Sequence, residues 1–520
     1  MAFVVSLLFS VVSSVACSRL YGIDVIGQYA LTIGAIAIVR LLSTTKERPA
    51  LVRELTLLEP RSPRVTGLFV GTATFSTVLT LLVGVLVVLV ARLFLSGPIA
   101  QPGLFWPLAV SVAGYVAFGN LCETLDTVAS GFRAGRLLFW VRDGDALSFL
   151  LMAVALFGTN SVWGLVLALV ISQAFGVLHR LVRMRHFMRF RVSRRVLSDG
   201  FATVPDLVRF GLKIAPGALA DGFANQSGTW IVATFNPIAA VGAFGRAFLL
   251  VKQLMAVNLY ASEMLFPTLV ERHAKGDREG FARALADSLR YGTIAMLWIA
   301  VAGAGVATGV MHVFGAGFER GADALVVLLV IPALVVVAQT QRAALVAFGR
   351  PWLTSVAGFL RLGVALVAGI LLTWQFGGIG AASALVIAFL IDIAFVTRYV
   401  VPHLITPLHK LWRPVEWHAL AAACVGGFLA GRMLYRLLGY PFGLFAGAAA
   451  SAVAFLVLLV ITGGVNERDV ARLRDLRRMA AARRRGSRAP ETERPLEPEA
   501  MTQADRGERE PEGSAAESVL

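Results

Sequence analysis

The 520-residue chain has few of the residues on which disulfide frameworks, metal centres and catalytic sites depend. Its three cysteines, Cys17, Cys122 and Cys424, lie in apolar stretches and form no CxxC pair, so we expect neither a disulfide framework nor a zinc site. The sequence also has no glycine-rich phosphate loop and no base-reading motif. We therefore expect no cofactor, no metal and no nucleic-acid partner.

Charge is scarce too, because only 15% of the residues are charged whereas 57% are hydrophobic. Ordinary soluble domains are about 45–50% apolar. Apolar runs of about 20 residues, enough to cross a bilayer, recur along most of the chain. The sequence therefore predicts an all-α polytopic membrane protein.

The apolar runs predict 14 transmembrane helices. Their approximate ranges are 1–19, 28–45, 65–95, 104–131, 138–157, 161–181, 207–233, 238–266, 284–313, 322–347, 351–374, 378–398, 415–437 and 441–462. The first run has no basic segment before it, so we interpret it as a transmembrane helix and not as a signal peptide.

The net charge of +16 comes mostly from basic residues between the apolar runs, on alternate loops. The loop after the sixth run is the most basic, with seven arginines counted from Arg180 at the end of that run to Arg195, whereas the intervening loops are short and carry few charges. The positive-inside rule then places the basic loops and both termini in the cytoplasm. Basic loops of this kind indicate topology and contact with anionic membrane lipids, and not nucleic-acid binding.

A weak internal repeat relates two segments that are 215 positions apart. LYGIDVIGQYA at 20–30 resembles FNPIAAVGAFG at 235–245, with Gly27 aligned to Gly242. The two segments are separated by six membrane crossings, an even number, so both copies of the repeat have the same orientation in the membrane. We therefore predict two parallel six-helix repeats around a central cavity. We expect both segments to be outer loops, in which the two glycines allow tight turns. By this offset Met1 aligns with Pro216, inside the first helix of the second repeat.

Four regions follow from this division of the chain. Residues 1–200 form the first bundle and a basic linker, and residues 201–405 form the second bundle. Residues 406–465 add two transmembrane helices. Residues 466–520 begin with a basic run and continue acidic and nearly free of large apolar residues, which predicts a disordered cytoplasmic tail. Its basic part either contacts anionic lipid or is simply solvated.

Four stretches together resemble the polysaccharide flippases of the multidrug/oligosaccharidyl-lipid/polysaccharide exporter (MOP) superfamily. They are SRLYGIDVIGQYAL, RFGLKIAPGALADGFANQ, VFGAGFERGADALVVLL and AFGRPWLTSVAGFLRLGVALVAGILLTWQFGGIGAASALVIAFLI. The resemblance covers roughly residues 1–400, and the two additional C-terminal helices are also found in lipid II flippases.

The resemblance implies a bacterial inner-membrane flippase that moves an undecaprenyl-diphosphate-linked oligosaccharide from the inner to the outer leaflet for polysaccharide export. It also implies a basic central cavity and coupling to an ion gradient or membrane potential. The expected partners are the polyprenyl-diphosphate-linked glycan, membrane lipids and a polysaccharide polymerase with its export machinery.

Four cations inside predicted crossings are candidates for binding the diphosphate: Arg40, Lys213, Arg246 and Lys252. Arg40 lies near the cytoplasmic end of its helix, and extension of its side chain to the membrane surface is the alternative. For Arg246 the alternative is an ion pair with Asp221 that serves only packing.

The candidates for binding a coupling ion are Asp221, Asn225, Glu263 and Asp392, which also lie inside predicted crossings. For Asp392 the first interpretation is a buried ion pair with Arg361, and protonation is the second. We expect Glu123 and Asp126 to be structural, paired with Arg133 or Arg136.

Two other functions remain open from the sequence. A multidrug extruder of the same superfamily would need a cavity suited to organic cations, with acidic and aromatic residues. A membrane-embedded polysaccharide polymerase or ligase would need a substantial outer loop with catalytic side chains, and no predicted outer loop exceeds about a dozen residues. We therefore expect a transporter and not an enzyme.

Overall fold

The structure is a computed structural model that describes residues 2–43, 47–56, 58–97, 100–101, 103–132, 134–159, 161–185, 187–188, 193–212, 215–350, 352–400 and 417–464. Residues 1–464 form one compact unit, and the predicted tail lies outside the described residues.

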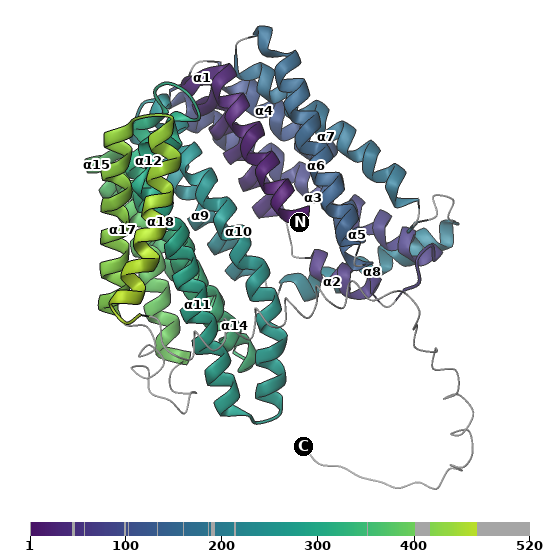
Figure 1. Ribbon diagram of the computed structural model, residues 1–520. Helices are drawn as coiled ribbons and strands as arrows, with labels where there is room; N and C mark the ends of the chain where they lie inside the picture. Colours follow the sequence, from purple (N-terminus) through teal and green to yellow (C-terminus); the bar gives the residue numbers. More distant parts are fainter. Residues whose placement is uncertain are drawn as a thin grey trace, which may run out of the picture. The chain divides into compact units, whose positions relative to one another are not determined.

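Helices account for the regular structure of the described residues (Figure 1). The first half contains α1 (Ala2–Ser43), α2 (Glu47–Leu55), α3 (Pro63–Ser96), α4 (Phe105–Gly114), a π-helix (Tyr115–Gly119), α5 (Asn120–Gly131), α6 (Gly135–Ala155), a 3-10 turn (Phe157–Thr159) and α7 (Val162–Met184). A linker helix, α8 (Arg194–Leu212), follows. The second half contains α9 (Ala215–Phe235), α10 (Ile238–Ala274), α11 (Arg278–Gly305), α12 (Ala307–His312), a 3-10 turn (Phe318–Gly321), α13 (Ala322–Leu328), α14 (Ile331–Ala347) and α15 (Trp352–Val400). The chain ends its described part with α17 (Trp417–Leu438) and α18 (Phe442–Ile461).

Ten helices in the described part of the chain are long and apolar enough to cross a membrane. Two of them are too long for one crossing, because a straight helix the length of α15 would extend about 73 Å against a hydrocarbon core of about 30 Å. Both contain a glycine with non-helical backbone angles, Gly22 in α1 and Gly377 in α15.

The chain reverses direction at these two glycines. A Cβ placed on Gly380 would lie 2.0 Å from the carbonyl oxygen of Leu372, an approach that a continuous helix does not allow. In α1, Ser14 and Ala30 meet neighbouring residues of α10, although a straight helix would separate them by about 24 Å. These two hairpins, together with α6 and α9, complete the 14 predicted crossings.

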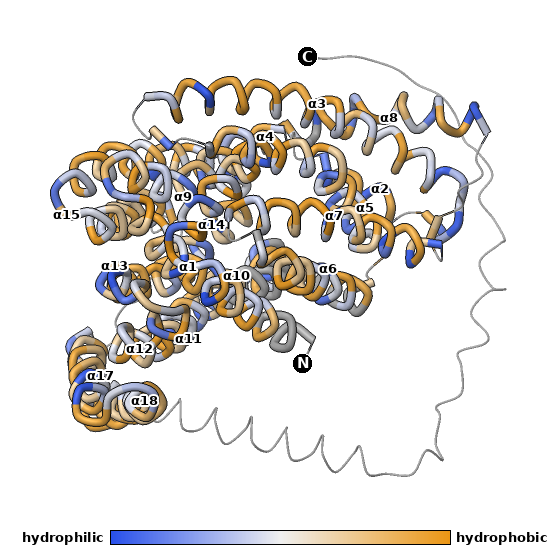
Figure 2. The backbone as a smooth tube through the Cα atoms, turned by 90° about the horizontal axis from the view of Figure 1, so that it is seen from above, coloured by the Kyte–Doolittle hydropathy of each residue, from blue (hydrophilic) through white to orange (hydrophobic). Residues whose placement is uncertain are grey.

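The two ends of the helical bundle are distinguished by their connections. We call the end with Gly22 and Gly377 the turn end, and the end with α2 and α8 the linker end. The predicted boundary at residue 200 falls inside α8, which packs against the start of α3. A Cβ on Gly200 would lie 2.1 Å from the carbonyl oxygen of Gly67, so glycine permits this close contact. α17 and α18 lie at the rim beside α11 and α12 (Figure 2).

The repeated segments pack against each other at the turn end in a reciprocal manner. A Cβ on Gly27 would lie 2.2 Å from the carbonyl oxygen of Ile238, and one on Gly242 would lie 2.3 Å from that of Ile23. Because the offset of 215 aligns Ile23 with Ile238 and Gly27 with Gly242, the two contacts are equivalent. An approximate two-fold axis between the halves would produce such a pair, as two parallel repeats require.

The expected role of these glycines as turn residues is wrong. Gly27 lies inside the second arm of α1 and Gly242 lies inside α10, so both are helical. The first turn is formed at Gly22, whose φ of 76° favours glycine, and the second lies at residues 236–237. Gly27 and Gly242 serve instead to bring two helix backbones together.

The exposed surface is that of a protein in lipid. α3 exposes a continuous apolar stripe, which includes Leu82 and Leu93. Five exposed tryptophans lie near helix ends at two levels: Trp106 and Trp374 at the turn end, and Trp140, Trp352 and Trp417 at the linker end; a sixth, Trp298, lies about two turns before the end of α11. Tryptophan favours the two membrane–water interfaces, so these levels mark the edges of the hydrocarbon layer.

The reciprocal contact leads to a test of the packing between the halves. We expect Gly27→Ala and Gly242→Ala each to destabilise the protein by roughly 1–3 kcal/mol, because the added methyl group would overlap a backbone carbonyl. Thermal unfolding of the purified protein in detergent would measure the change. Gly245→Ala is the matched control, since its methyl group would lie at an ordinary 3.5 Å from Ala30. Equal unfolding midpoints for all three variants would contradict the assignment.

Candidate functional site

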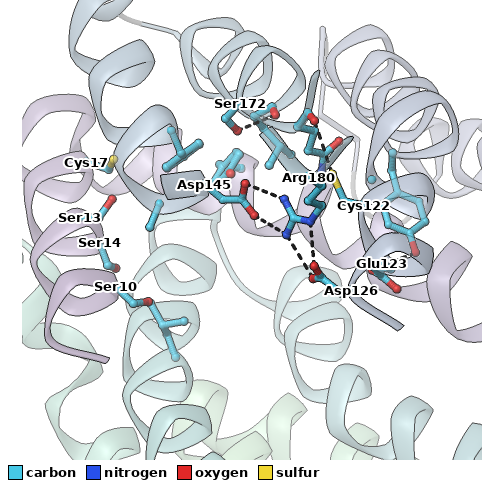
Figure 3. A pocket seen from close by; sticks show the side chains of 18 of the residues that line it. Ser10, Ser13, Ser14, Cys17, Cys122, Glu123, Asp126, Asp145, Ser172 and Arg180 are labelled. Carbon is cyan, nitrogen blue, oxygen red and sulfur yellow. Dashed lines mark hydrogen bonds and ion pairs between the residues drawn. The ribbon is translucent and has the colours of Figure 1, made fainter. Parts of the chain in front are cut away.

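A cavity of about 470 Å³, lined by both polar and apolar side chains, lies mainly in the first bundle (Figure 3). Its lining comes from α1, the α4–α5 segment, α6 and α7, and the second half contributes Arg246 and Leu249 of α10. The sequence predicted a cavity between the halves, and this cavity instead lies within one half and is closed on one side by the other. It extends from the level of Arg246 toward the linker end.

Arg246 lies about 12 Å along α10 from its start at the turn end. Its Nη1 donates a 2.8 Å hydrogen bond to Ser14 Oγ, and its Nε has no hydrogen-bond partner. No carboxylate among the described residues pairs with it. The alternative pairing with Asp221 does not form, because Asp221 binds other arginines.

The wall opposite Ser13 and Ser14 of α1 is built around Arg180 of α7 (Figure 3). Its guanidinium lies between two carboxylates, with Nε 2.8 Å from Asp126 Oδ1 and Nη2 2.7 Å from Asp145 Oδ2. Sequence reasoning assigned Arg180 to a basic cytoplasmic loop, and it paired Asp126 with Arg133 or Arg136. The structure corrects both points, because Asp126 binds Arg180 and the Arg180 side chain is only 3% exposed.

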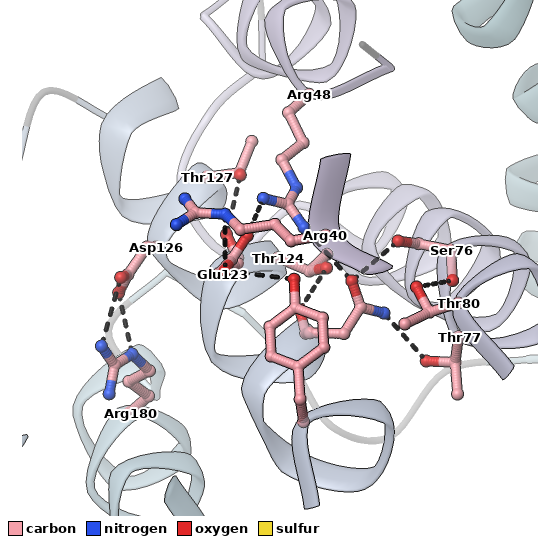
Figure 4. A network of polar contacts seen from close by, with 12 residues as sticks. Arg40, Arg48, Ser76, Thr77, Thr80, Glu123, Thr124, Asp126, Thr127 and Arg180 are labelled. Carbon is pink, nitrogen blue, oxygen red and sulfur yellow. Dashed lines mark hydrogen bonds and ion pairs between the residues drawn. The ribbon is translucent and has the colours of Figure 1, made fainter. Parts of the chain in front are cut away.

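Glu123 forms a second polar network beside this wall (Figure 4). Arg40 Nε lies 3.0 Å from Glu123 Oε1, Arg48 pairs with the other carboxylate oxygen, and Tyr115 donates a 3.2 Å hydrogen bond to Oε1. Glu123 is therefore bound by Arg40 and Arg48, and not by the arginines expected for it. Arg40, a candidate for binding the diphosphate, already has a carboxylate partner, although 61% of its side chain remains exposed.

A π-helical turn brings Tyr115 and Glu123 onto one face. Eight residues of regular α-helix would rotate the second side chain about 80° away from the first. The wider turn at 115–119 removes most of this offset, and the 3.2 Å hydrogen bond results. The same helix presents Asn120, whose Oδ1 accepts hydrogen bonds from Ser76 and Arg48.

The remaining predicted cations have different outcomes. Lys252 does not line the cavity, and its Nζ lies 4.7 Å from the centre of the Phe248 ring and 3.5 Å from Gln226 Oε1. No carboxylate in the described part of the chain pairs with Lys252. Lys213 lies outside the described residues, as does the side chain of Glu263.

Two of the coupling-ion candidates belong to a four-residue network inside the second bundle. Arg342 pairs with Asp221 and places Nη2 2.7 Å from Asp392 Oδ2. Arg361 Nη2 lies 2.9 Å from Asp221 Oδ1, whereas its Nη1 is 4.0 Å from Asp392 Oδ2. The expected Arg361–Asp392 pair is thus secondary, and sequence reasoning missed Arg342, which binds both acids. Asn225 lies one turn beyond Asp221 on α9 and is partly exposed.

The sequence gave no match to family models or to curated proteins. Among solved structures, the lipid II flippase MurJ in an inward-closed conformation is similar, with a TM-score of 0.65 at 11% identity, over 89% of this chain and 97% of that chain. An inward-facing multidrug resistance MATE family transporter of the MOP superfamily is similar with a TM-score of 0.56 at 15% identity, over 76% and 95% of the two chains. The chain shares the fold of these two proteins.

The superfamily resemblance in the sequence is therefore confirmed at the level of the fold, as is the prediction of an all-α, multi-pass membrane protein. Within this fold, the cavity lies mainly in the first bundle, and the second contributes Arg246, which has no carboxylate partner in the described part of the chain. The roles of the candidate residues in binding remain predictions.

The Arg180 wall can be tested by stability. Arg180→Leu would leave two partly buried carboxylates without a cation, so we expect it to lower the free energy of unfolding by roughly 3 kcal/mol. Arg183→Leu, on the exposed face of the same helix, is the control. Detergent-solubilised protein would be compared by thermal unfolding, and equal midpoints for the two variants would exclude a structural role for Arg180.

Proposed function

We propose that the protein is a flippase that moves an undecaprenyl-diphosphate-linked oligosaccharide from the inner to the outer leaflet of the bacterial inner membrane. The proposal is carried by Arg246 at the wall of the cavity, because its guanidinium has no carboxylate partner among the described residues. Arg180, the other arginine among the cavity residues, is paired with Asp126 and Asp145. Of the two arginines that line the cavity, Arg246 is therefore the one that could pair with an anionic ligand.

The energetic argument rests on the cost of a lone charge in the membrane. An unpaired arginine there costs several kcal/mol, and a ligand that brings a negative charge offsets this cost. A diphosphate suits a guanidinium because it offers several oxygens to the planar N–H groups. The Nε of Arg246 is buried and has no hydrogen-bond partner among the described residues, so it could donate to a ligand only if the side chains that cover it move.

The hydroxyl groups beside Arg246 extend this polar surface. Ser10, Ser13 and Ser14 lie at spacings of three and four on α1, so they share one face, and all three line the cavity. Hydroxyls can donate to phosphate oxygens or bond to sugar hydroxyls. A volume of about 470 Å³ is in the range of small-ligand sites, so it fits the diphosphate and adjoining sugar better than a whole oligosaccharide.

Movement between leaflets requires the two halves to separate at one end and close at the other. The halves meet at the turn end through the Gly27 and Gly242 contacts, and Arg19 Nε donates a 2.8 Å hydrogen bond to the carbonyl of Val313 there. With the basic linker end in the cytoplasm, the turn end is the outer face. Rocking of the halves would break these contacts and release the substrate outward.

A multidrug extruder is the alternative within the same fold. It would need carboxylates free to meet an organic cation in the cavity. Glu123, Asp126 and Asp145 line the cavity, and each is bound by an arginine. This arrangement favours an anionic substrate over a cationic one.

Export in cells that depend on the protein tests the proposal. We expect charge reversal at both Arg246 and Lys252 to abolish glycan export, and Arg246→Gln alone to reduce it roughly tenfold or more, because a charge-assisted hydrogen bond is lost. Arg436→Gln is the control, since Arg436 is exposed on the peripheral helix α17. Normal export by the double variant, at the normal membrane level of the protein, would rule out this site. A drug-efflux assay in a sensitised strain would identify the alternative.

A further inference from the structure

The network in the second bundle is neutral as a unit. Two arginines, Arg342 and Arg361, meet two aspartates, Asp221 and Asp392, so the formal charges cancel. The four residues come from α9, α14 and both arms of α15. Asp392 is fully buried and Arg361 is 6% exposed, so water contributes little to their solvation.

The position of Arg342 is central to this network. Its two terminal nitrogens bind carboxylate oxygens from two different helices, Asp221 on α9 and Asp392 on the second arm of α15. One cationic group therefore bridges two buried acids. An inorganic cation bound between two carboxylates would make the same kind of link, because hard cations take oxygen ligands.

The second arginine of the network, Arg361, contacts Asp221 and the aromatic ring beside Asp392. Arg361 Nη2 donates to the carbonyl oxygen of Asp221 at 3.1 Å as well as pairing with its carboxylate. Its guanidinium also lies 4.5 Å from the centre of the Phe389 ring, one turn before Asp392 on the same arm of α15. Asp392 Oδ1 accepts no hydrogen bond among the described residues, so this buried acid keeps one oxygen for a further ligand.

We propose that Arg342 is a built-in counter-ion that occupies the place of an alkali cation between Asp221 and Asp392, and so removes the need for such a cation in the second bundle. Asp221 and Asp392 would then act as permanent links between helices and not as sites of ion coupling. The inference goes beyond the proposed function, since it concerns ion binding and holds whatever the substrate is.

Removal of the guanidinium should convert the network into a cation site. Arg342→Gln would leave two acids and one arginine, a net charge of −1 in a buried position. Such a site is unstable unless a cation enters or a proton binds. Arg342→Gln combined with Asp392→Asn keeps one acid and one arginine, and it should need neither.

The experiment compares thermal unfolding of the purified full-length protein in sodium, lithium or potassium chloride with unfolding in N-methylglucamine chloride at equal ionic strength. We expect no cation-specific shift for the unaltered protein. For Arg342→Gln we expect a saturable rise of roughly 3–5 °C in sodium or lithium. The double variant should lose this rise.

Two results would overturn the inference. The first is an alkali-cation shift in the unaltered protein that disappears in the double variant, because the cation would then bind in the intact network. The second is a folded Arg342→Gln variant that responds to none of the cations. If Arg342→Gln cannot be purified, the comparison of the unaltered protein with the double variant still decides the question. A failure here leaves the Arg246 assignment intact, because that assignment is tested by export.

Discussion

The cost of placing a charge in the membrane interior governs the arrangement of polar residues in this protein. A charged side chain that leaves water must find an opposite charge or a set of hydrogen bonds, and otherwise it destabilises the fold. The structure meets this requirement with arginines that bridge acids from different helices. Arg180 joins Asp126 and Asp145 in the first bundle, and Arg342 joins Asp221 and Asp392 in the second. Against this pattern, Arg246 stands out because its partner is a serine hydroxyl.

The two halves share an architecture but differ in what their interiors contain. Their common origin is visible at the turn end, where equivalent glycines receive equivalent carbonyl groups. The first half encloses the cavity, whereas the interior of the second half holds a neutral charge network. We infer a division of labour in which the first bundle receives the substrate, and the second supplies Arg246 and moves as a firmly linked body.

The lengths of the apolar runs were sufficient to predict the class of fold and its membrane-crossing helices, because the thickness of the membrane sets the length of a crossing. The orientation inferred from loop charge stays a prediction. The repeat offset predicted which residues of the halves correspond. It did not predict the role of Gly27 and Gly242, since a glycine needed for close helix contact looks the same in a sequence as one needed for a turn. The reversal occurs at Gly22, which lies inside the loop predicted between the first two apolar runs.

The ion pairs were harder to predict, because they depend on how each helix is rotated toward its neighbours. Arg342 lies inside the predicted crossing 322–347, so the sequence marks it as an intramembrane cation but does not show which acids it meets. Arg180 lies at the end of a predicted crossing, where it was counted with the basic loop. The π-helical turn at 115–119 shifts the face on which Glu123 lies, and no periodicity in the sequence marks it. The sequence marked Arg246 as a candidate because it lies in an apolar run just after the repeated segment. Only the structure shows that no carboxylate among the described residues pairs with it.

Binding of a polyprenyl diphosphate to the purified protein tests most directly whether the cavity at Arg246 binds an anionic ligand. The comparison would use the matching polyprenyl alcohol, which has the same tail and no phosphate, at fixed ionic strength. The account predicts at least tenfold tighter binding of the diphosphate, since a charge-assisted hydrogen bond contributes roughly 1.5–3 kcal/mol. Equal affinity for the two lipids would contradict it.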